Sequence, residues 1–126
     1  MGAMTRAVGP PAIGRADETI VVFASDNGPV TTQWLQWHEV NLYGETGGWR
    51  GRKHFLYDGG IRVPAIVRYP GVVTSGKMNG ALIVGVDWVP TLARWMDLDL
   101  PADRMIDGVD QSAVLSGQDE GNAYPD

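Results

Sequence analysis

Two short stretches of this chain carry the residue types best suited to chemistry. The pair Asp26-Asn27 directly follows a run of apolar and β-branched side chains at residues 19–24, and Lys53 ends a basic cluster further along. One carboxylate and one amide supply oxygen ligands of the kind that calcium or magnesium binds. A lysine ammonium is a compact charge with three donors, which suits a tetrahedral anion. Asp26 and Asn27 are therefore candidate ligands of a hard cation, and Lys53 is a candidate contact for an anion.

Each of these features also has a simpler interpretation. Asp-Asn-Gly is common in turns, because Asp and Asn bond their own backbone and glycine accepts positive φ. A basic cluster is usually a solvated surface. The two histidines, His38 and His54, lack the spacing to other ligands that a zinc site needs. Residue types alone therefore do not decide between a simple turn and a metal site at Asp26-Asn27, or between a solvated surface and an anion contact at Lys53.

The elements that would position these residues form an α/β pattern. Residues 19–24 show no polar alternation, which is typical of a strand covered on both faces in a parallel sheet. Ligands of open α/β sheets bind where the chain leaves the carboxyl end of a strand, and Asp26 follows there. Further strands are predicted over residues 63–69 and 81–84, with Arg62 as a structural anchor of the turn before the first of them.

Two helices are predicted in the second half of the chain. Asp87 suits an N-cap and Pro90 the first turn, where no intrahelical donor is needed. The apolar residues of one helical face are predicted to pack on the sheet; they are Val89, Leu92, Ala93 and Met96. Asp110 is expected to cap a short helix over residues 111–115.

The segment between the two chemical stretches is rich in aromatic residues. Residues 29–49 contain Trp34, Trp37 and Trp49. Thr31 or Thr32 would cap a short helix there. Large rings usually pack in a core, but exposed rings also form flat surfaces on which sugars stack. The sequence leaves both roles open.

Size and composition exclude several classes of protein. The 126 residues carry a net charge of −5, with a pI of about 4.8, which argues against nucleic-acid binding. No stretch approaches the ~20 apolar residues of a membrane span, so a soluble protein is expected. Residues 1–14 lack the charged and apolar regions of a secretion signal. Without cysteine, disulfides and thiolate chemistry are excluded, and the compartment is left open.

The motifs, taken in order, resemble the sulfatase family of the alkaline-phosphatase-like hydrolases. They are Ser-Asp-Asn-Gly at 25–28, Arg-Gly-Arg-Lys at 50–53, Asp-Gly-Gly-Ile-Arg-Val-Pro at 58–64, Tyr-Pro-Gly at 69–71, Val-Asp-Trp-Val-Pro-Thr-Leu at 86–92 and Ile-Asp-Gly-Val-Asp at 106–110. The resemblance covers most of the chain after residue 15. It implies an α/β fold: a partial sulfatase-like (alkaline-phosphatase-like) sheet with packed helices, truncated. The expected organisation is an N-terminal arm (1–17), a sulfatase-like fragment (18–117) and a mobile tail (118–126).

The resemblance also implies a role for each candidate residue. Lys53 matches the lysine that contacts the sulfate ester and stabilises the leaving oxygen, while Asp26 and Asn27 match ligands of Ca²⁺. The family's nucleophile, a formylglycine within Cys/Ser-x-Pro-x-Arg, has no match here, and neither do two further calcium aspartates. Asp58 stands where the family usually has Glu. The chain is therefore expected to contribute metal and sulfate contacts to sulfuric ester hydrolysis, and to be inactive alone.

Two alternatives stay open beside this interpretation. A truncated sheet leaves an exposed edge, which predicts a homo-oligomer and a non-enzymatic binding or assembly module. A phosphoester hydrolase segment of the same superfamily is the second alternative, because a phosphate ester presents a similar tetrahedral group.

Overall fold

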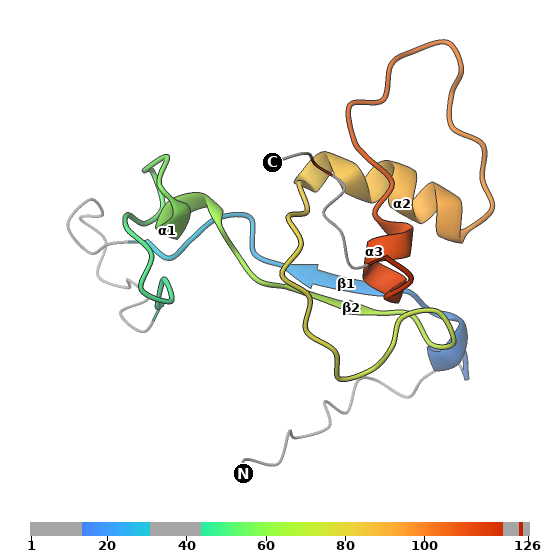
Figure 1. The fold of residues 1–126 in the computed structure, drawn as a ribbon, viewed down its shortest axis with the longest axis horizontal. Coiled ribbons are helices and arrows are strands. Elements are labelled where there is room, and N and C mark those ends of the chain that lie inside the picture. The colour runs from blue at the N-terminus through green and yellow to red at the C-terminus, as the bar shows by residue number, and fades with distance from the viewer. Residues whose placement is uncertain (1–13, 31–43, 120–123, 125–126) are drawn as a thin grey trace. The chain divides into compact units, whose positions relative to one another are not determined.

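The computed structural model describes residues 14–30, 44–119 and 124, and these divide into two compact units. We call Ile20–Arg68 the strand unit, and the described residues of Met1–Thr19 and Tyr69–Asp126 the helical unit. Figure 1 shows the elements, which in chain order are the 3₁₀-helix η1 (Ala16–Glu18), β1 (Val21–Ala24), α1 (Asp58–Ile61), β2 (Ala65–Arg68), the 3₁₀-helix η3 (Gly85–Asp87), α2 (Trp88–Trp95) and α3 (Ser112–Ser116).

The strand unit is built on one antiparallel ladder. β1 pairs with β2 in a register that sets Val21 opposite Arg68 and Ala24 opposite Ala65. Both strands lie within the ranges that the sequence predicts. Pro64 lies directly before β2, where its missing N–H costs no ladder bond.

The prediction of a parallel strand covered on both faces is wrong for the described residues. Every residue of β1 is exposed, and the largest apolar side chains of the ladder, Phe23 and Ile66, keep 69% and 59% of their surface accessible. A run of β-branched residues favours an extended backbone, but it encodes neither the direction of the partner nor what covers the faces. The expected homo-oligomer through a sheet edge stays a prediction.

The third predicted strand does not form. Residues 81–84 have no strand structure, because side chains take the backbone donors that a ladder would use. The Ala81 N–H donates to Asn79 Oδ1 at 2.8 Å, and the Val84 N–H donates to Asp87 Oδ2 at 2.8 Å. Asn and Asp side chains commonly compete with secondary structure in this way.

Both predicted helices of the helical unit are present. α2 begins at Trp88 with Pro90 in its first turn. Asp87 holds the N-cap position of α2, as predicted, but its side chain makes no cap bond to that helix. α3 begins one residue later than expected, and the Ser112 N–H donates to Asp110 Oδ1 at 2.8 Å. It ends at Gly117, whose φ of 78° suits glycine.

The buried face of α2 differs from the predicted one. Val89 and Met96 are 55% and 51% exposed, whereas Pro90, Thr91 and Ala93 are buried. Thr91 decides this orientation, because its hydroxyl accepts the Gln111 N–H at 2.9 Å and ties α2 to the residue before α3. The predicted apolar face is therefore buried at Ala93, half-buried at Leu92 and exposed at Val89 and Met96. Its packing on the sheet stays a prediction.

Several expectations fall on residues that the structure leaves undescribed. The cap at Thr31 or Thr32, Trp34, Trp37 and His38 lie outside the described residues. Most of the N-terminal arm and of the C-terminal tail lies outside them as well. Within the described parts of the chain, no helix is long and apolar enough to cross a membrane.

Candidate active site

The loop that follows β1 is held by the backbone of residues 49–61, which form a loop and the short helix α1. The Gly28 N–H donates to the Gly60 carbonyl at 2.8 Å, and the Lys53 N–H donates to the Pro29 carbonyl at 3.0 Å. Because backbone groups make both bonds, the approach of the two loops does not depend on long side chains. It brings the segment with Asn27 against the segment with Lys53.

This approach requires glycine at the contact points. A Cβ on Gly28 would overlap the Gly59 carbonyl oxygen, and a Cβ on Gly60 would overlap that of Phe55. Gly59 lies among three carbonyl oxygens, those of Gly51, Arg50 and Trp49, of which the last two would lie 2.8 Å from an added Cβ. The glycines of Asp-Asn-Gly and Asp-Gly-Gly therefore serve close backbone packing, a role that only a residue without a Cβ can fill.

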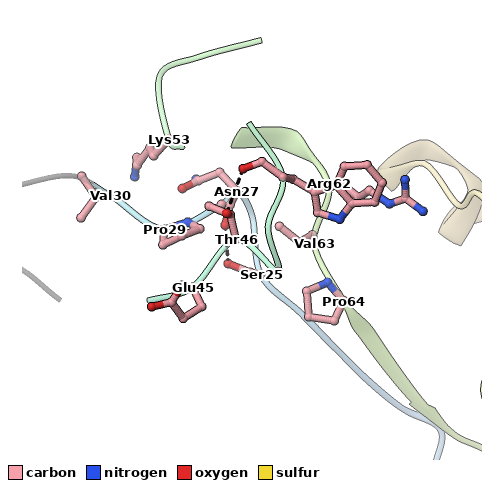
Figure 2. Close-up of a pocket in the computed structure, with 13 residues that line it drawn as sticks. Ser25, Asn27, Pro29, Val30, Glu45, Thr46, Lys53, Arg62, Val63 and Pro64 are labelled. Atoms are coloured by element: carbon pink, nitrogen blue, oxygen red, sulfur yellow. Dashed lines mark hydrogen bonds between the residues drawn. The ribbon is translucent and has the colours of Figure 1, made fainter. Parts of the chain in front are cut away.

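A pocket of about 840 Å³ opens beside these loops, within the strand unit (Figure 2). Its polar lining includes Ser25, Asn27 and Lys53. The other lining residues are Gly28, Pro29, Val30, Glu45, Thr46, Gly47, Trp49, Arg62, Val63 and Pro64. The volume lies in the range of small-molecule sites, which is about 300–1,000 Å³.

Two of the three predicted site residues line this pocket together. Asn27 and Lys53 are both half-buried there, whereas Asp26 is exposed and is not among the lining residues. The Asn27 backbone is fixed by the Ser25 hydroxyl, which donates to its carbonyl at 2.8 Å. The structure thus brings the anion candidate next to one of the two metal candidates.

Lys53 differs from the other cations around it. Arg52 donates to the Gly44 carbonyl at 3.0 Å, and the Arg50 guanidinium lies 4.0 Å from the centre of the Tyr57 ring. The Arg62 guanidinium lies 4.4 Å from the centre of the Trp49 ring, in agreement with an anchoring role. Among the described residues, Lys53 has no such partner for its ammonium, so its charge is available to a ligand.

The described residues do not complete a site for calcium. Asp26 and Asn27 offer hard oxygen ligands, which fit the chemistry of the ion, but calcium takes six to eight of them. No group of three or more His, Cys, Asp or Glu side chains gathers anywhere in the described parts of the chain. The donor type therefore fits calcium and the donor count does not.

A second polar cluster lies in the helical unit, around the fully buried carboxylate of Asp87. Oδ1 accepts the Val109 N–H at 2.9 Å and the Tyr124 hydroxyl, while Oδ2 accepts the Val84 N–H and Gln111 Nε2 at 2.8 and 3.2 Å. Burial by itself raises the pKa of Asp87, but these donors outweigh burial and hold the pKa below 3.8. The hydrogen bond from the Tyr124 hydroxyl to Asp87 also raises the pKa of Tyr124. None of these residues is among those that line the pocket with Lys53, and we interpret the cluster as structural.

The sequence missed several pocket residues and predicted others. Ser25 adjoins Asp26 in one motif, and Arg62 lies in the motif at 58–64, so both residues have a signal in the sequence. Glu45 and Thr46 belong to the long connection after β1 and carry no such signal. In the helical unit, Gln111 and Tyr124 were missed as partners of Asp87 because they are distant from it along the chain.

Comparison with known proteins identifies the family. The Sulfatase family profile matches residues 12–98. The chain is 38% identical to steryl-sulfatase of Rattus norvegicus, over 83% of this chain and 18% of that protein. It is 36% identical to N-acetylgalactosamine-6-O-sulfatase of Bacteroides thetaiotaomicron, over 82% and 20%, and 34% identical to arylsulfatase A of Bos taurus, over 100% and 24%.

The chain therefore spans about a fifth of the length of these relatives. The matched region contains the loop after β1, the loop that carries Lys53 and the whole of α2. The ordered motifs and the match over most of the chain agree, and the chain belongs to the sulfatase family.

Proposed function

We propose that this chain supplies the sulfate-contacting part of a sulfatase active site, with Lys53 as the residue that binds the ester group. The observation that carries the proposal is the position of Lys53: its ammonium has no partner among the described residues and lines the same pocket as Asn27. A preorganised cation next to a sulfate ester stabilises the negative charge that grows on the leaving oxygen during hydrolysis. Backbone bonds between the two segments hold the main chain of Lys53 in position.

We further propose that the 126-residue chain by itself does not turn over sulfate esters. Its sequence contains no cysteine and no serine in the context of the family's nucleophile motif. Hydrolysis needs a nucleophile as well as charge stabilisation, and Lys53 supplies only the latter. The chain would therefore bind a sulfate ester without cleaving it.

Substitution of Lys53 by alanine is expected to weaken the binding of phenyl sulfate about fivefold. A charge-assisted hydrogen bond contributes about 1.5–3 kcal/mol when buried, and partial exposure of Lys53 reduces this to roughly 1 kcal/mol. Binding is measured from the amide NMR shifts of residues 25–30 and 50–62 during titration, and phenol release is followed in the same samples.

Lys77→Ala is the matched control, because it removes the same charge from an exposed lysine outside the pocket. Equal losses in the two variants would mean that only net charge matters, and would contradict a specific sulfate contact. Phenol release by the wild-type chain would contradict the proposed inactivity. A parallel titration with phenyl phosphate tests the phosphoester alternative, which requires tighter binding of the phosphate.

For Asp26 and Asn27 we propose a weak, partial contribution to a calcium site. Two oxygen ligands leave most of the coordination shell to water, so calorimetric titration of the chain with CaCl₂ is expected to give a dissociation constant in the millimolar range or weaker. Asp26→Ala is expected to remove the heat that remains, whereas Asp99→Ala, which removes an exposed carboxylate elsewhere, is expected to preserve it. Micromolar binding, or equal effects of the two variants, would contradict this assignment.

A further inference from the structure

The outer side of β1 is an open sheet edge. β1 and β2 form a two-stranded sheet, so each of them pairs on one side only (Figure 1). Beyond that ladder, no other described segment makes a backbone hydrogen bond to residues 20–24. The side chains of β1 are exposed as well. Because a two-stranded ladder is marginally stable in water, a further strand would stabilise it.

β1 lacks the features by which edge strands of natural proteins avoid a partner. Such strands carry charged side chains, prolines or bulges. Residues 19–25, Thr-Ile-Val-Val-Phe-Ala-Ser, contain no charged residue and no proline. The ladder also runs from Val21 to Ala24 in one unbroken register, without a bulge. β1 can therefore accept a further strand along its whole length.

The outer edge of β2 has the protection that β1 lacks. Pro64 directly precedes this strand, and Pro70 follows two residues after its end. A proline has no N–H to donate to a ladder, which limits how far a further strand could pair. Arg68 adds a charge at the end of β2. Of the two edges of this sheet, that of β1 is the one that suits a further strand.

We propose that β1 pairs antiparallel with β1 of a second copy of this chain, which gives a four-stranded sheet in the order β2-β1-β1-β2. A second copy fits because the edge is self-complementary: a two-fold axis sets the same uncharged strand against itself, so no like charges meet. The proposal does not depend on sulfate binding. It assigns an edge and an orientation to the homo-oligomer that the sequence predicts.

The two-fold axis also fixes the register. Directly opposed residues of an antiparallel sheet point to the same face, whereas neighbours along a strand point to opposite faces. Under a two-fold axis, one residue of β1 must therefore lie opposite its own copy. The positions that give β1 its longest overlap are Val22 and Phe23, and only one of the two can be the central one.

The first test introduces a charge on either side of the sheet. Val22→Lys is compared with Val67→Lys, because Val67 lies directly opposite Val22 in the ladder but belongs to β2. The mass of the full chain is measured by sedimentation equilibrium from micromolar concentrations upward, and the wild type is expected to reach twice 13.6 kDa. The dissociation constant of the dimer is expected to rise at least about tenfold in Val22→Lys and less than about twofold in Val67→Lys, since a lysine protects the edge on which it lies.

The second test uses the absence of cysteine from this chain, so that a single introduced thiol reports its own neighbour. A disulfide forms only between residues whose Cα atoms lie within about 7 Å. Under mild air oxidation, either Val22→Cys or Phe23→Cys is expected to form a covalent dimer, and the other is not. Ile66→Cys and Val67→Cys, on β2, are the controls and are expected to stay monomeric on denaturing gels. This test remains informative if Val22→Lys fails to fold.

Several outcomes would overturn the proposal. They include a wild-type chain that stays at 13.6 kDa at every concentration, and equal weakening of the dimer by Val22→Lys and Val67→Lys. Equal cross-linking of Phe23→Cys and Ile66→Cys would mean that the copies meet through the sheet face that these two opposed residues share. Cross-linking of both β1 variants, or of neither in a chain that dimerises, would contradict the two-fold pairing of β1.

Discussion

Replacing Asp87 with alanine is expected to lower the stability of the helical unit by about 3–5 kcal/mol. The substitution removes the acceptor of four donors, of which the Val84 and Val109 N–H groups are backbone and cannot turn elsewhere. A buried donor left without a partner costs about 1–3 kcal/mol, and removing one side of a buried charged cluster costs about 3–5 kcal/mol in total. Native-state hydrogen exchange of the α2 amides measures the change in the opening free energy.

The pH dependence of the same measurement provides a second readout. The pKa of Asp87 lies below 3.8 in the folded chain, because the bonds from Tyr124, Val109, Val84 and Gln111 outweigh the effect of burial. Because the pKa of Asp87 is lower in the folded chain than in the unfolded chain, the ionised carboxylate contributes its full stabilisation above the ordinary pKa of 3.8. This stabilisation is lost as the pH falls through the lower pKa of the folded chain. The wild type is therefore expected to lose stability below pH 3.8, and Asp87→Ala to lose less over the same range.

Asp107→Ala is the matched control, since it removes an exposed carboxylate from the neighbouring loop. It is expected to change the opening free energy by less than about 0.5 kcal/mol. Similar exchange rates in the two variants would contradict the expected contribution of the Asp87 carboxylate to the stability of the helical unit. So would a loss of stability at low pH that is unchanged in Asp87→Ala. Tyr124→Phe, which removes one donor, is expected to have a smaller effect than Asp87→Ala.

A methyl group at Gly59 is expected to destabilise the strand unit by about 2–4 kcal/mol and to open the pocket. The added Cβ would lie 2.8 Å from the Arg50 and Trp49 carbonyl oxygens and would overlap that of Gly51. Overpacking usually costs about 1–3 kcal/mol, and here the neighbours are backbone atoms that cannot rotate away. The shift should also break the bond of 2.8 Å from the Gly59 N–H to the Arg50 carbonyl. Hydrogen exchange of the Gly28, Lys53 and Gly59 amides measures the loss.

Gly80→Ala provides the comparison for this substitution. No atom lies within 4 Å of a Cβ at Gly80, and its φ lies outside the positive range that disfavours alanine. Alanine there is expected to be neutral or slightly stabilising, because it restricts the unfolded chain. If Gly59→Ala were as mild as Gly80→Ala, the two loops would not be packed as closely as their glycines indicate. In that case the positions of Asn27 and Lys53 would need another explanation.

The roles that the sequence predicts for the site residues stay predictions, and the structure adds where those residues lie. Asn27 and Lys53 line one pocket, although 25 residues separate them along the chain, while exposed Asp26 does not line it. The motifs led to the prediction that Asp26, Asn27 and Lys53 carry the chemistry, because the motifs resemble those of sulfatases and because carboxylate, amide and ammonium groups have fixed preferences for ligands. They did not indicate Glu45, Thr46 or the stack of Arg62 on Trp49, which depend on how the loops fold back.

Local structure was the part of the fold that the sequence predicted best. β1, β2, α2 and α3 all form where β-branched runs, Pro90 and Asp110 indicate them. Residues 81–84 were mispredicted because Asn79 and Asp87, which lie two and three residues from the donors they bind, take the N–H groups of a potential strand. This competition is local, and its signal in the sequence is the polar residue on either side of the apolar run.

By itself, then, the amino-acid sequence determined the family, the local elements and the identity of the chemical groups, since these depend on residue types and short spacings. Only the tertiary structure decided the antiparallel pairing of β1 with β2, the buried face of α2 and the pocket that joins Asn27 to Lys53. Those features depend on contacts between residues far apart in the chain. Such contacts require close backbone packing, and at Gly28 and Gly59 that packing is possible because glycine has no Cβ.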